Sequence, residues 1–350
     1  MRRLVRWVRR LVLMVLLVCI GLGAPVIYVE TMCQGTAVAT PYDAVIGPDH
    51  HRPETRTLMT YPEWHIVHAY EDYAEVLRTG DPHDYGFLRG ISGFWGSLCA
   101  LTSAASIHGV VDGGTKQMVY VIGVSFTAEL ALKAAYEETI GRIATMLRGR
   151  NRTPLDELSA TQAAEYANFL QQTPWYKWPF TQDVQDLNTQ ASDGFRDTER
   201  RIALGLEYRA KAAYADVIAQ AVAQVGADEL TLRMIVNGGD QSTLGAYDGV
   251  RIIQERSEGT EIEAPRYREL THLLVEMAND GWDIVEIAGN DDIMFTALSE
   301  DPRVTDALYS RARQGFGGHR HLIRLPVTDL AARLRAMKDS PLRLEHIHDY

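Results

Sequence analysis

The segment LVLMVLLVCIGLGAPVIYV, residues 11–29, decides how this chain is organised, because its 19 residues include no charged one. An α-helix of this length extends about 28 Å, which is close to the hydrocarbon thickness of a lipid bilayer. Since backbone groups inside lipid must hydrogen-bond to one another, we expect a helix here. Five arginines lie within the first ten residues, and Glu30 follows the segment. The positive-inside rule therefore predicts a cytoplasmic basic tip and a body beyond the inner membrane.

A cleaved signal peptide would show the same basic and apolar regions. The nearest small-residue site follows Ala24, but cleavage there would leave Pro25 at the new N-terminus and Leu22 where a small residue is preferred. Cys33 follows Glu-Thr-Met, which differs from the small residues that precede a lipid-modified cysteine. We therefore predict that residues 1–30 form an uncleaved anchor, and that the protein is single-pass with a periplasmic body.

The 350-residue chain is 46% hydrophobic and 23% charged, which is ordinary for a globular protein. Its net charge is −11, and from residue 31 onward it has 45 acidic and 30 basic residues. A body this acidic is poorly suited to a phosphate backbone, so we predict no nucleic-acid partner. Of the three cysteines, Cys33 and Cys99 lie on the predicted oxidising side. This placement favours a disulfide between them over two buried free thiols.

The first half of the body has a helical pattern. Residues 31–60 are rich in glycine and proline and predict an extended linker. From residue 61 to 226 the apolar spacing predicts a helical bundle domain. The longest expected helix, 116–148, is apolar on most faces, so we place it at the centre of the bundle. The other helices are expected at 62–79, 85–106, 154–172 and 194–223.

The remainder of the chain, residues 227–350, alternates strand and helix patterns. The order β-α-β-β, an insert and then β-α-β favours a small ferredoxin-like α+β domain. No internal repeat is evident in the sequence. The expected strands are 231–237, 250–254, 282–288, 293–299, 319–326 and 342–350, and the expected helices are 265–280 and 327–339.

The run TYPEWHIVHAYEDYAE, which begins at Thr60, carries the strongest chemical signal. Residues spaced i, i+4, i+7 and i+11 share one face of a helix, and here they are Tyr61, His65, His68 and Asp72. Two imidazoles one turn apart and a carboxylate can hold a divalent transition metal when a second helix completes the site. Glu129, in the apolar middle of the longest expected helix, is the best further ligand.

Two alternatives remain for these residues. They form a structural polar network in the first, because Glu129, Lys133 and Glu137 are spaced four apart and can pair with one another. Buried histidines in such a network would bond to backbone or tyrosine groups. In the second alternative, a polar ligand pocket or interface includes Tyr61, Trp64 and Glu137.

The segment TPWYKWPF, residues 173–180, gathers four aromatic side chains around two prolines. Tryptophan and tyrosine favour membrane interfaces, so this segment could rest on a bilayer or form the wall of a site for a lipid-like ligand. The alternative is that it packs at one end of the bundle. The four aromatic residues are Trp175, Tyr176, Trp178 and Phe180.

Two further histidine pairs, His319/His321 and His346/His348, each point to one face of an expected strand. These strands flank one crossover helix and should run parallel. One pair begins its strand and the other ends its strand, so we expect the pairs at opposite ends of the sheet, without a joint metal site.

The runs TYPEWHIVHAYEDYA, VIGVSFTAELALKAAYEETIGR, QTPWYKWPF and EIAGNDDI resemble a group of uncharacterised bacterial single-span inner-membrane proteins. The resemblance covers most of the chain after the anchor. That group has no established activity, so the resemblance implies a bacterial inner-membrane setting and no catalytic residues.

Two functions follow as hypotheses. The first is an anchored periplasmic protein that binds a hydrophobic or membrane-derived ligand, or a membrane partner, in an accessory or scaffold role. The sequence contains no P-loop, dinucleotide fingerprint, nucleophile elbow or C-x-x-C motif. This absence favours the non-catalytic hypothesis. The second is a metal-dependent oxidoreductase or hydrolase acting on a lipid-like substrate, with His65 and His68 as metal ligands.

Overall fold

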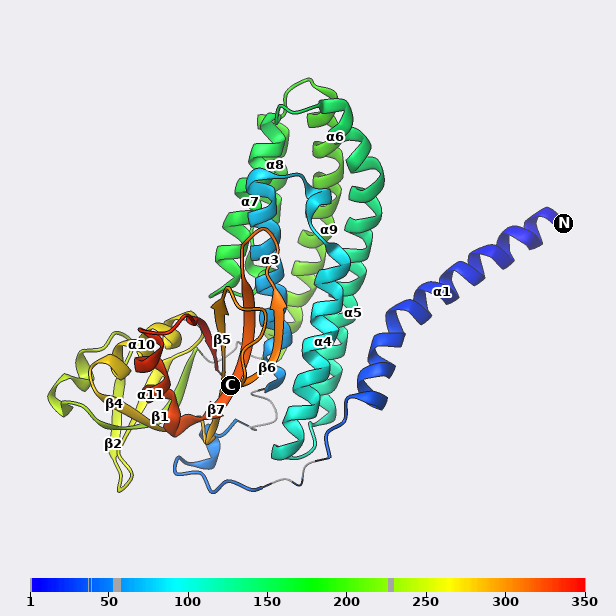
Figure 1. Ribbon diagram of the computed structural model, residues 1–350. Coiled ribbons are helices and arrows are strands. Elements are labelled where there is room, and N and C mark those ends of the chain that lie inside the picture. Colours follow the sequence, from blue (N-terminus) through cyan, green and yellow to red (C-terminus); the bar gives the residue numbers. More distant parts are fainter. Residues whose placement is uncertain (1, 37, 39, 53–57, 226–229, 350) are drawn as a thin grey trace.

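A computed structural model describes residues 2–36, 38, 40–52, 58–225 and 230–349. It confirms the coarse prediction of an N-terminal apolar helix, a helical part and a C-terminal α+β part (Figure 1). The apolar helix is α1 (Arg2–Met32). The helical body contains α3 (Tyr61–Thr79), α4 (Phe87–Ala105), α5 (Gly113–Tyr136), α6 (Arg142–Arg148), α7 (Pro154–Leu170), α8 (Phe180–Gln190) and α9 (Phe195–Val225).

The long helix predicted at 116–148 is continuous, but it lies at the outside of the helical body. A π-helical turn at Glu137–Gly141 joins α5 to α6. We expected this helix at the centre of the bundle, and that expectation was wrong, since many of its apolar side chains are exposed. The reason is that three of its charged residues, Glu129, Lys133 and Glu137, face inward and pair with α9.

The C-terminal part contains two four-stranded antiparallel sheets, where we expected a single sheet. The sheets have the strand orders β2-β3-β1-β4 and β6-β7-β5-β8. The first sheet and its helix are β1 (Thr231–Gly238), β2 (Arg251–Glu255), β3 (Thr260–Pro265), α10 (Arg268–Asn279) and β4 (Trp282–Ile287). The second set is β5 (Asp292–Ser299), β6 (Ala307–Ala312), β7 (His319–Pro326), α11 (Val327–Met337) and β8 (Arg343–His348).

The two sets have the same topology, so the domain contains an internal structural repeat that the sequence did not reveal. Each set has three strands, a helix and a fourth strand that pairs with the first. The ferredoxin-like fold is not confirmed. Sequence patterning missed β3 and β6, because the sequence TEIEAP of β3 is rich in glutamate and ALYSRA of β6 has no fully buried residue.

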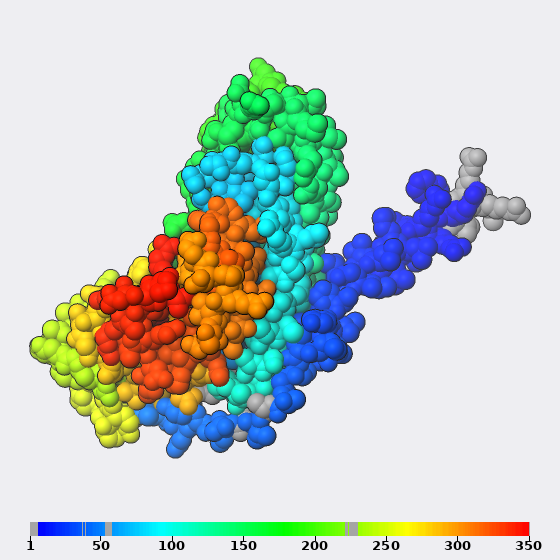
Figure 2. Space-filling model, viewed as in Figure 1, coloured from blue at the N-terminus to red at the C-terminus, as the bar shows by residue number. Residues whose placement is uncertain are grey.

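The second sheet contributes to two cores. Phe295 and Ile323 belong to the core that α10 and α11 share with the first sheet. Met294 and Leu322, the alternate residues of the same strands, belong to the core of the helical body. This alternation is the ordinary pleat of a strand. The sheet therefore joins the two parts of the molecule, which are packed together in the space-filling view (Figure 2).

Between α1 and α3, the described residues 33–36, 38 and 40–52 contain one 3₁₀ turn, at Pro48–His50, and no other helix or strand. This segment lies against the edge strand β4 of the first sheet. The buried carboxylate of Glu286 accepts hydrogen bonds from the backbone of Val45 and Ile46 and from the Tyr42 hydroxyl. At its start, the disulfide that we predicted between Cys33 and Cys99 joins the end of α1 to α4.

Candidate functional site

Three ion pairs cross between α5 and α9 in the helical body. On α5 and the first residue of the π-helical turn after it, the charges are four residues apart, so they lie on one face. Their signs alternate, and each meets an opposite charge on the antiparallel helix α9. The pairs are Glu129–Lys211 at 2.8 Å, Lys133–Glu207 at 3.0 Å and Glu137–Arg200 at 2.9 Å. We call these three pairs the charge ladder.

The charge ladder continues into a buried network near the tip of the body. Arg200 also bonds Glu199, and Arg196 joins Glu199 to Asp156. Arg148 then links Asp156 to Asp81. The side chains of Arg196 and Arg200 are 2% and 1% exposed, so these charges lie in the interior and depend on their partners.

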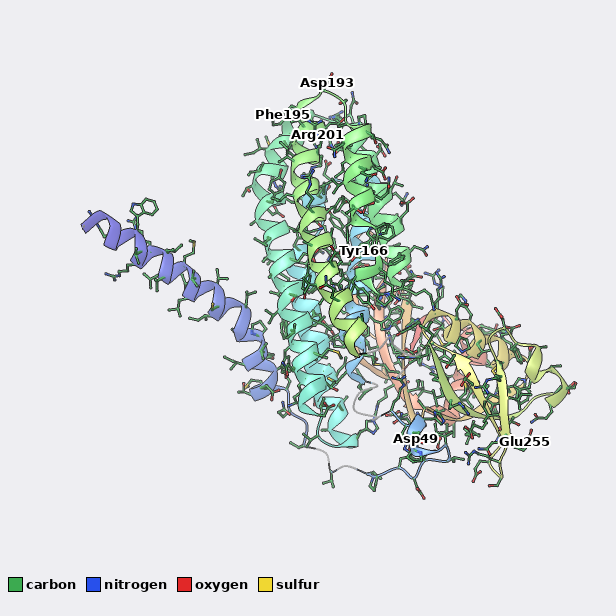
Figure 3. The ribbon with its side chains drawn as sticks, turned by 180° about the vertical axis from the view of Figure 1, so that it is seen from behind. Asp49, Tyr166, Asp193, Phe195, Arg201 and Glu255 are labelled. Carbon is green, nitrogen blue, oxygen red and sulfur yellow. A yellow bond between two sulfur atoms is a disulfide. The ribbon has the colours of Figure 1, made fainter. Side chains whose placement is uncertain are left out.

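Apolar side chains lie on the outside of the same helices. Between residues 117 and 135, none of the exposed residues of α5 is charged. The large apolar side chains that line the outside of α5, α6 and α9 are 40–76% exposed. Figure 3 shows α9 from this side, with Phe195 labelled near the tip. We define as the apolar face Met118, Val121, Leu132, Ile140, Ile143, Met146, Leu147, Phe195, Ile202, Leu206, Tyr214 and Val217.

The opposite side of the body is polar. Glu157, Thr161 and Glu165 are exposed on α7, and Gln182 and Asn188 are exposed on α8. The α5–α9 side thus has charges inside and apolar groups outside, which is the distribution found where helices contact lipid or other membrane helices. A surface of this kind on a water-soluble protein marks an interaction site.

Two helices of the described chain are long and apolar enough to cross a membrane, judged by length and composition. They are Arg6–Met32 and Gly113–Arg148, the second with 28% of its most apolar stretch buried. The core helix of a soluble protein or a signal sequence would pass the same test.

The aromatic segment that we considered for a membrane interface packs inside the body. Phe180 is 2% exposed and meets Tyr166. The indole of Trp178 donates to Asp183 at 2.7 Å, and the ring of Trp175 lies 5.2 Å from that of Tyr214. Tyr176 is partly buried beside them. A cavity of about 30 Å³ near this segment, lined in part by Tyr166 and Trp178, has room for one water and not for a lipid-like ligand.

The histidines of α3 lie at the contact between the helical body and the second sheet. His65 donates from Nε2 to the Gly90 carbonyl at 3.0 Å and accepts from Arg311 at Nδ1. His68 donates from Nδ1 to Glu71 at 3.0 Å. Asp72 accepts the backbone N–H of Gln314 at 2.9 Å.

The four predicted metal ligands are not brought together. His65, His68 and Asp72 share the predicted face of α3, but Glu129 is in the charge ladder on α5. Glu137, which we placed in a polar pocket, also pairs within the ladder. Helix α5 turns both carboxylates toward α9, away from the histidines. Sequence spacing could not show this, because their partners lie far along the chain.

Arg320 is the central charge of this contact, and sequence patterning missed it. Its guanidinium binds both carboxylate oxygens of Glu345, at 2.5 and 2.7 Å. It also lies 3.4 Å from Glu71 and 3.8 Å from Asp72. Arg320 is 2% exposed, so one buried positive charge is shared among these three carboxylates. The nearby positive charge lowers the pKa of Glu345 to about 2, against the opposing effect of burial.

Several buried polar atoms around β8 have no hydrogen-bond partner in the described part of the chain. They are the Tyr61 hydroxyl, Nε2 of His68, Nε2 of His346 and both ring nitrogens of His348. Trp64 stacks on His346 with 3.6 Å between ring centroids, and Tyr61 meets His348 edge-on. Burial lowers the pKa of His346 to about 3 and the pKa values of His65 and His348 well below their usual range.

The histidine pair of β7, His319/His321, lies apart from the pair of β8, His346/His348, as we expected. The reason differs from the expected one. On β5, His321 is level with Ala297 and His346 with Thr296, so the pairs are not at opposite ends of the sheet. They point to opposite faces instead. His321 bonds Ser299 and Ser310 on the side of the α10–α11 core.

Comparison with protein-family models, curated proteins and solved structures gave no significant match. Two features of the molecule bear on its function, namely the apolar face with its charge ladder and the histidine contact at β8.

Replacing Arg200 with methionine tests the charge ladder. The substitution leaves Glu137 buried without its ionic partner and Glu199 with Arg196 alone, so we expect the free energy of unfolding to fall by about 3–5 kcal/mol. Chemical denaturation of the full chain in detergent measures this change. The control is Arg201→Met at the exposed neighbouring position, with an expected effect of about 0.5 kcal/mol or less. Equal effects for the two variants would contradict the ladder's role.

Acid should destabilise the contact at β8. His346 takes up a proton near pH 3 in the folded chain and near 6.5 when unfolded, so the unfolded state binds more protons between these values. The free energy of unfolding should therefore decrease as the pH falls from about 6.5, by about 1.4 kcal/mol per pH unit for this group. His346→Gln should flatten the measured slope by that amount. His272→Gln, at a position that is 67% exposed, should leave the slope as steep as in the parent.

Proposed function

We propose that this protein is a single-span protein of the bacterial inner membrane whose periplasmic body binds a hydrophobic component of the membrane through the apolar face. The role is that of an accessory or scaffold protein without catalysis. One observation carries the proposal, namely that large apolar side chains lie outside α5, α6 and α9 while the three ion pairs of the charge ladder lie inside.

The N-terminal helix supports the anchoring part of the proposal. From Leu11 to Leu17 every side chain of α1 is an exposed large apolar group. A helix of this composition is stable in lipid, where it contacts acyl chains and its backbone is internally bonded. The basic residues before it favour an N-terminus in the cytoplasm. The disulfide between Cys33 and Cys99 fits the oxidising compartment in which the body would then lie.

Cysteine labelling tests this proposal. In a Cys19→Ser background, Leu132→Cys and Ile143→Cys place a thiol on the apolar face, and Ala164→Cys places one on the exposed side of α7. Intact spheroplasts are treated with a membrane-impermeant maleimide. We expect Ala164→Cys to react, because the body is periplasmic, and the two face variants to react much more slowly, because their thiols are covered.

Labelling after denaturation gives the total thiol for each variant. Equal rates at all three positions would mean that the apolar face is open, and would remove the binding proposal. Failure of Ala164→Cys to react until the cells are lysed would place the body in the cytoplasm and remove the topology.

A metal-dependent enzyme is the second candidate, and one observation favours it. His68 is 3% exposed, its Nε2 has no hydrogen-bond partner, and this atom lies 3.7 Å from Glu345. Glu71 holds the other ring nitrogen, as second-layer carboxylates do for metal-bound histidine. Ligand atoms of these three residues lie within 4.8 Å of one another. Arg320 already binds both oxygens of Glu345, which favours the non-catalytic role.

Metal analysis separates the two candidates. The full chain is purified without chelator, and its transition metals and melting temperature are measured before and after EDTA treatment. The enzyme candidate predicts bound metal that is lost in His68→Gln, and a lower melting temperature after EDTA. Absence of bound metal together with an unchanged melting temperature would remove this candidate.

A further inference from the structure

We infer that the hydrophobic component bound by the apolar face is the lipid bilayer itself. The helical body lies along the outer leaflet of the membrane that α1 crosses, with the apolar face among the acyl chains. This inference rests on the proposed function and names its partner. A membrane protein partner and a second copy of the chain are treated as outcomes of the test.

The first argument is that the apolar face begins where α1 is fixed to the body. Val29, in the last turns of α1, is fully buried in the core that it shares with α4 and α5. The carboxylate of Glu30 lies 3.0 Å from the Lys116 amine and accepts a hydrogen bond from the Tyr120 hydroxyl. Met118, the first residue of the apolar face, lies between these two positions on α5. The apolar face therefore begins at the end of α5 to which α1 is fixed.

The second argument is the side of the body from which α1 departs. In Figures 1 and 3, α1 leaves the base of the body on the side of α5, away from α7 and α8, and diverges from α5 toward its N-terminus. Lipid around α1 would therefore meet the α5 side of the body first. That side carries the apolar face, and the polar side of α7 and α8 is turned toward water.

The third argument is length. From Met118 to Leu147 the apolar face extends about 44 Å along α5 and α6, which exceeds the roughly 30 Å hydrocarbon thickness of a bilayer. A face of this length fits along a leaflet better than across it. A partner helix that crosses the membrane would meet only a short part of such a face, whereas a leaflet contacts all of it, as for interfacial amphipathic helices.

The fourth argument is the distribution of charge. The body is strongly acidic, yet Arg201 and Arg209 are exposed on α9 beside Ile202 and Leu206. The exposed carboxylates on this side include Glu138, which pairs with Arg142, and Asp216. Long arginine side chains can keep their charge at the lipid headgroups while their stems lie along apolar surface. Anionic headgroups attract such residues. On the polar side, α7 exposes Glu157 and Glu165, which the same headgroups would repel.

The test uses the purified full chain in nanodiscs that contain lipid and no other protein. An environment-sensitive NBD fluorophore is attached at Ile143→Cys, Ile202→Cys or the control Ala164→Cys, each in a Cys19→Ser background. The nanodiscs are prepared with ordinary or with brominated acyl chains, which quench the fluorophore on contact. We expect blue-shifted emission and strong quenching at positions 143 and 202, and neither effect at 164.

The headgroup contact is tested in the same system. Replacing both Arg201 and Arg209 with glutamine should reduce the quenching at position 143 in nanodiscs with anionic lipid. High salt should reduce it in the parent for the same reason. The matched control replaces Glu157 and Glu165 with glutamine on the polar side, and should leave the quenching unchanged.

The outcomes separate this inference from the function on which it rests. Unshifted and unquenched emission at 143 and 202 in lipid alone would overturn the inference. If the same positions stay protected in spheroplasts, the proposed function stands and a membrane protein covers the face. Protection that appears only in nanodiscs holding two copies would assign the face to a second copy. Open positions in both systems would remove the proposed function as well.

Discussion

The charge ladder between α5 and α9 is the interaction on which the helical body depends. Buried ions are tolerated only when they are paired, and the ladder pairs Glu129, Lys133 and Glu137 with charges on α9. With these positions turned inward, the helical period leaves the apolar residues of the same helices on the outside. The apolar face and the charged interior are therefore two consequences of one arrangement.

Features that follow from a periodic pattern within one helix could be predicted from the sequence. Contacts between two elements could not. Apolar periodicity located the long helices, and the shared face of His65, His68 and Asp72 on α3 followed from spacing alone. The spacing of Glu129, Lys133 and Glu137 also indicated ion pairing, but with one another. Their partners on α9 lie far away in the sequence, and a pattern within one helix cannot identify them.

The same limit explains the errors in the C-terminal part. Edge strand β6 has no fully buried residue, and β3 carries Glu261 and Glu263 between its apolar residues, so neither has a strong apolar pattern. Without them the expected order was that of one ferredoxin-like sheet. Arg320 was missed for a related reason. Its importance comes from Glu71 and Asp72 on α3 and Glu345 on β8, which only the packed structure brings to one point.

The internal repeat places β4 and β8 at equivalent edges of the two sheets, and both strands hold a segment of the N-terminal half of the chain. In the first set, Glu286 of β4 holds the backbone of the segment that follows α1. In the second set, β8 holds α3 through Glu345 and the stacked pair of His346 and Trp64. Together with the disulfide between Cys33 and Cys99, these contacts hold the chain at three places: at the end of α1, at Val45 and Ile46, and on α3. The C-terminal domain therefore restricts where α1 leaves the body, and under the proposed function it determines which side faces the membrane.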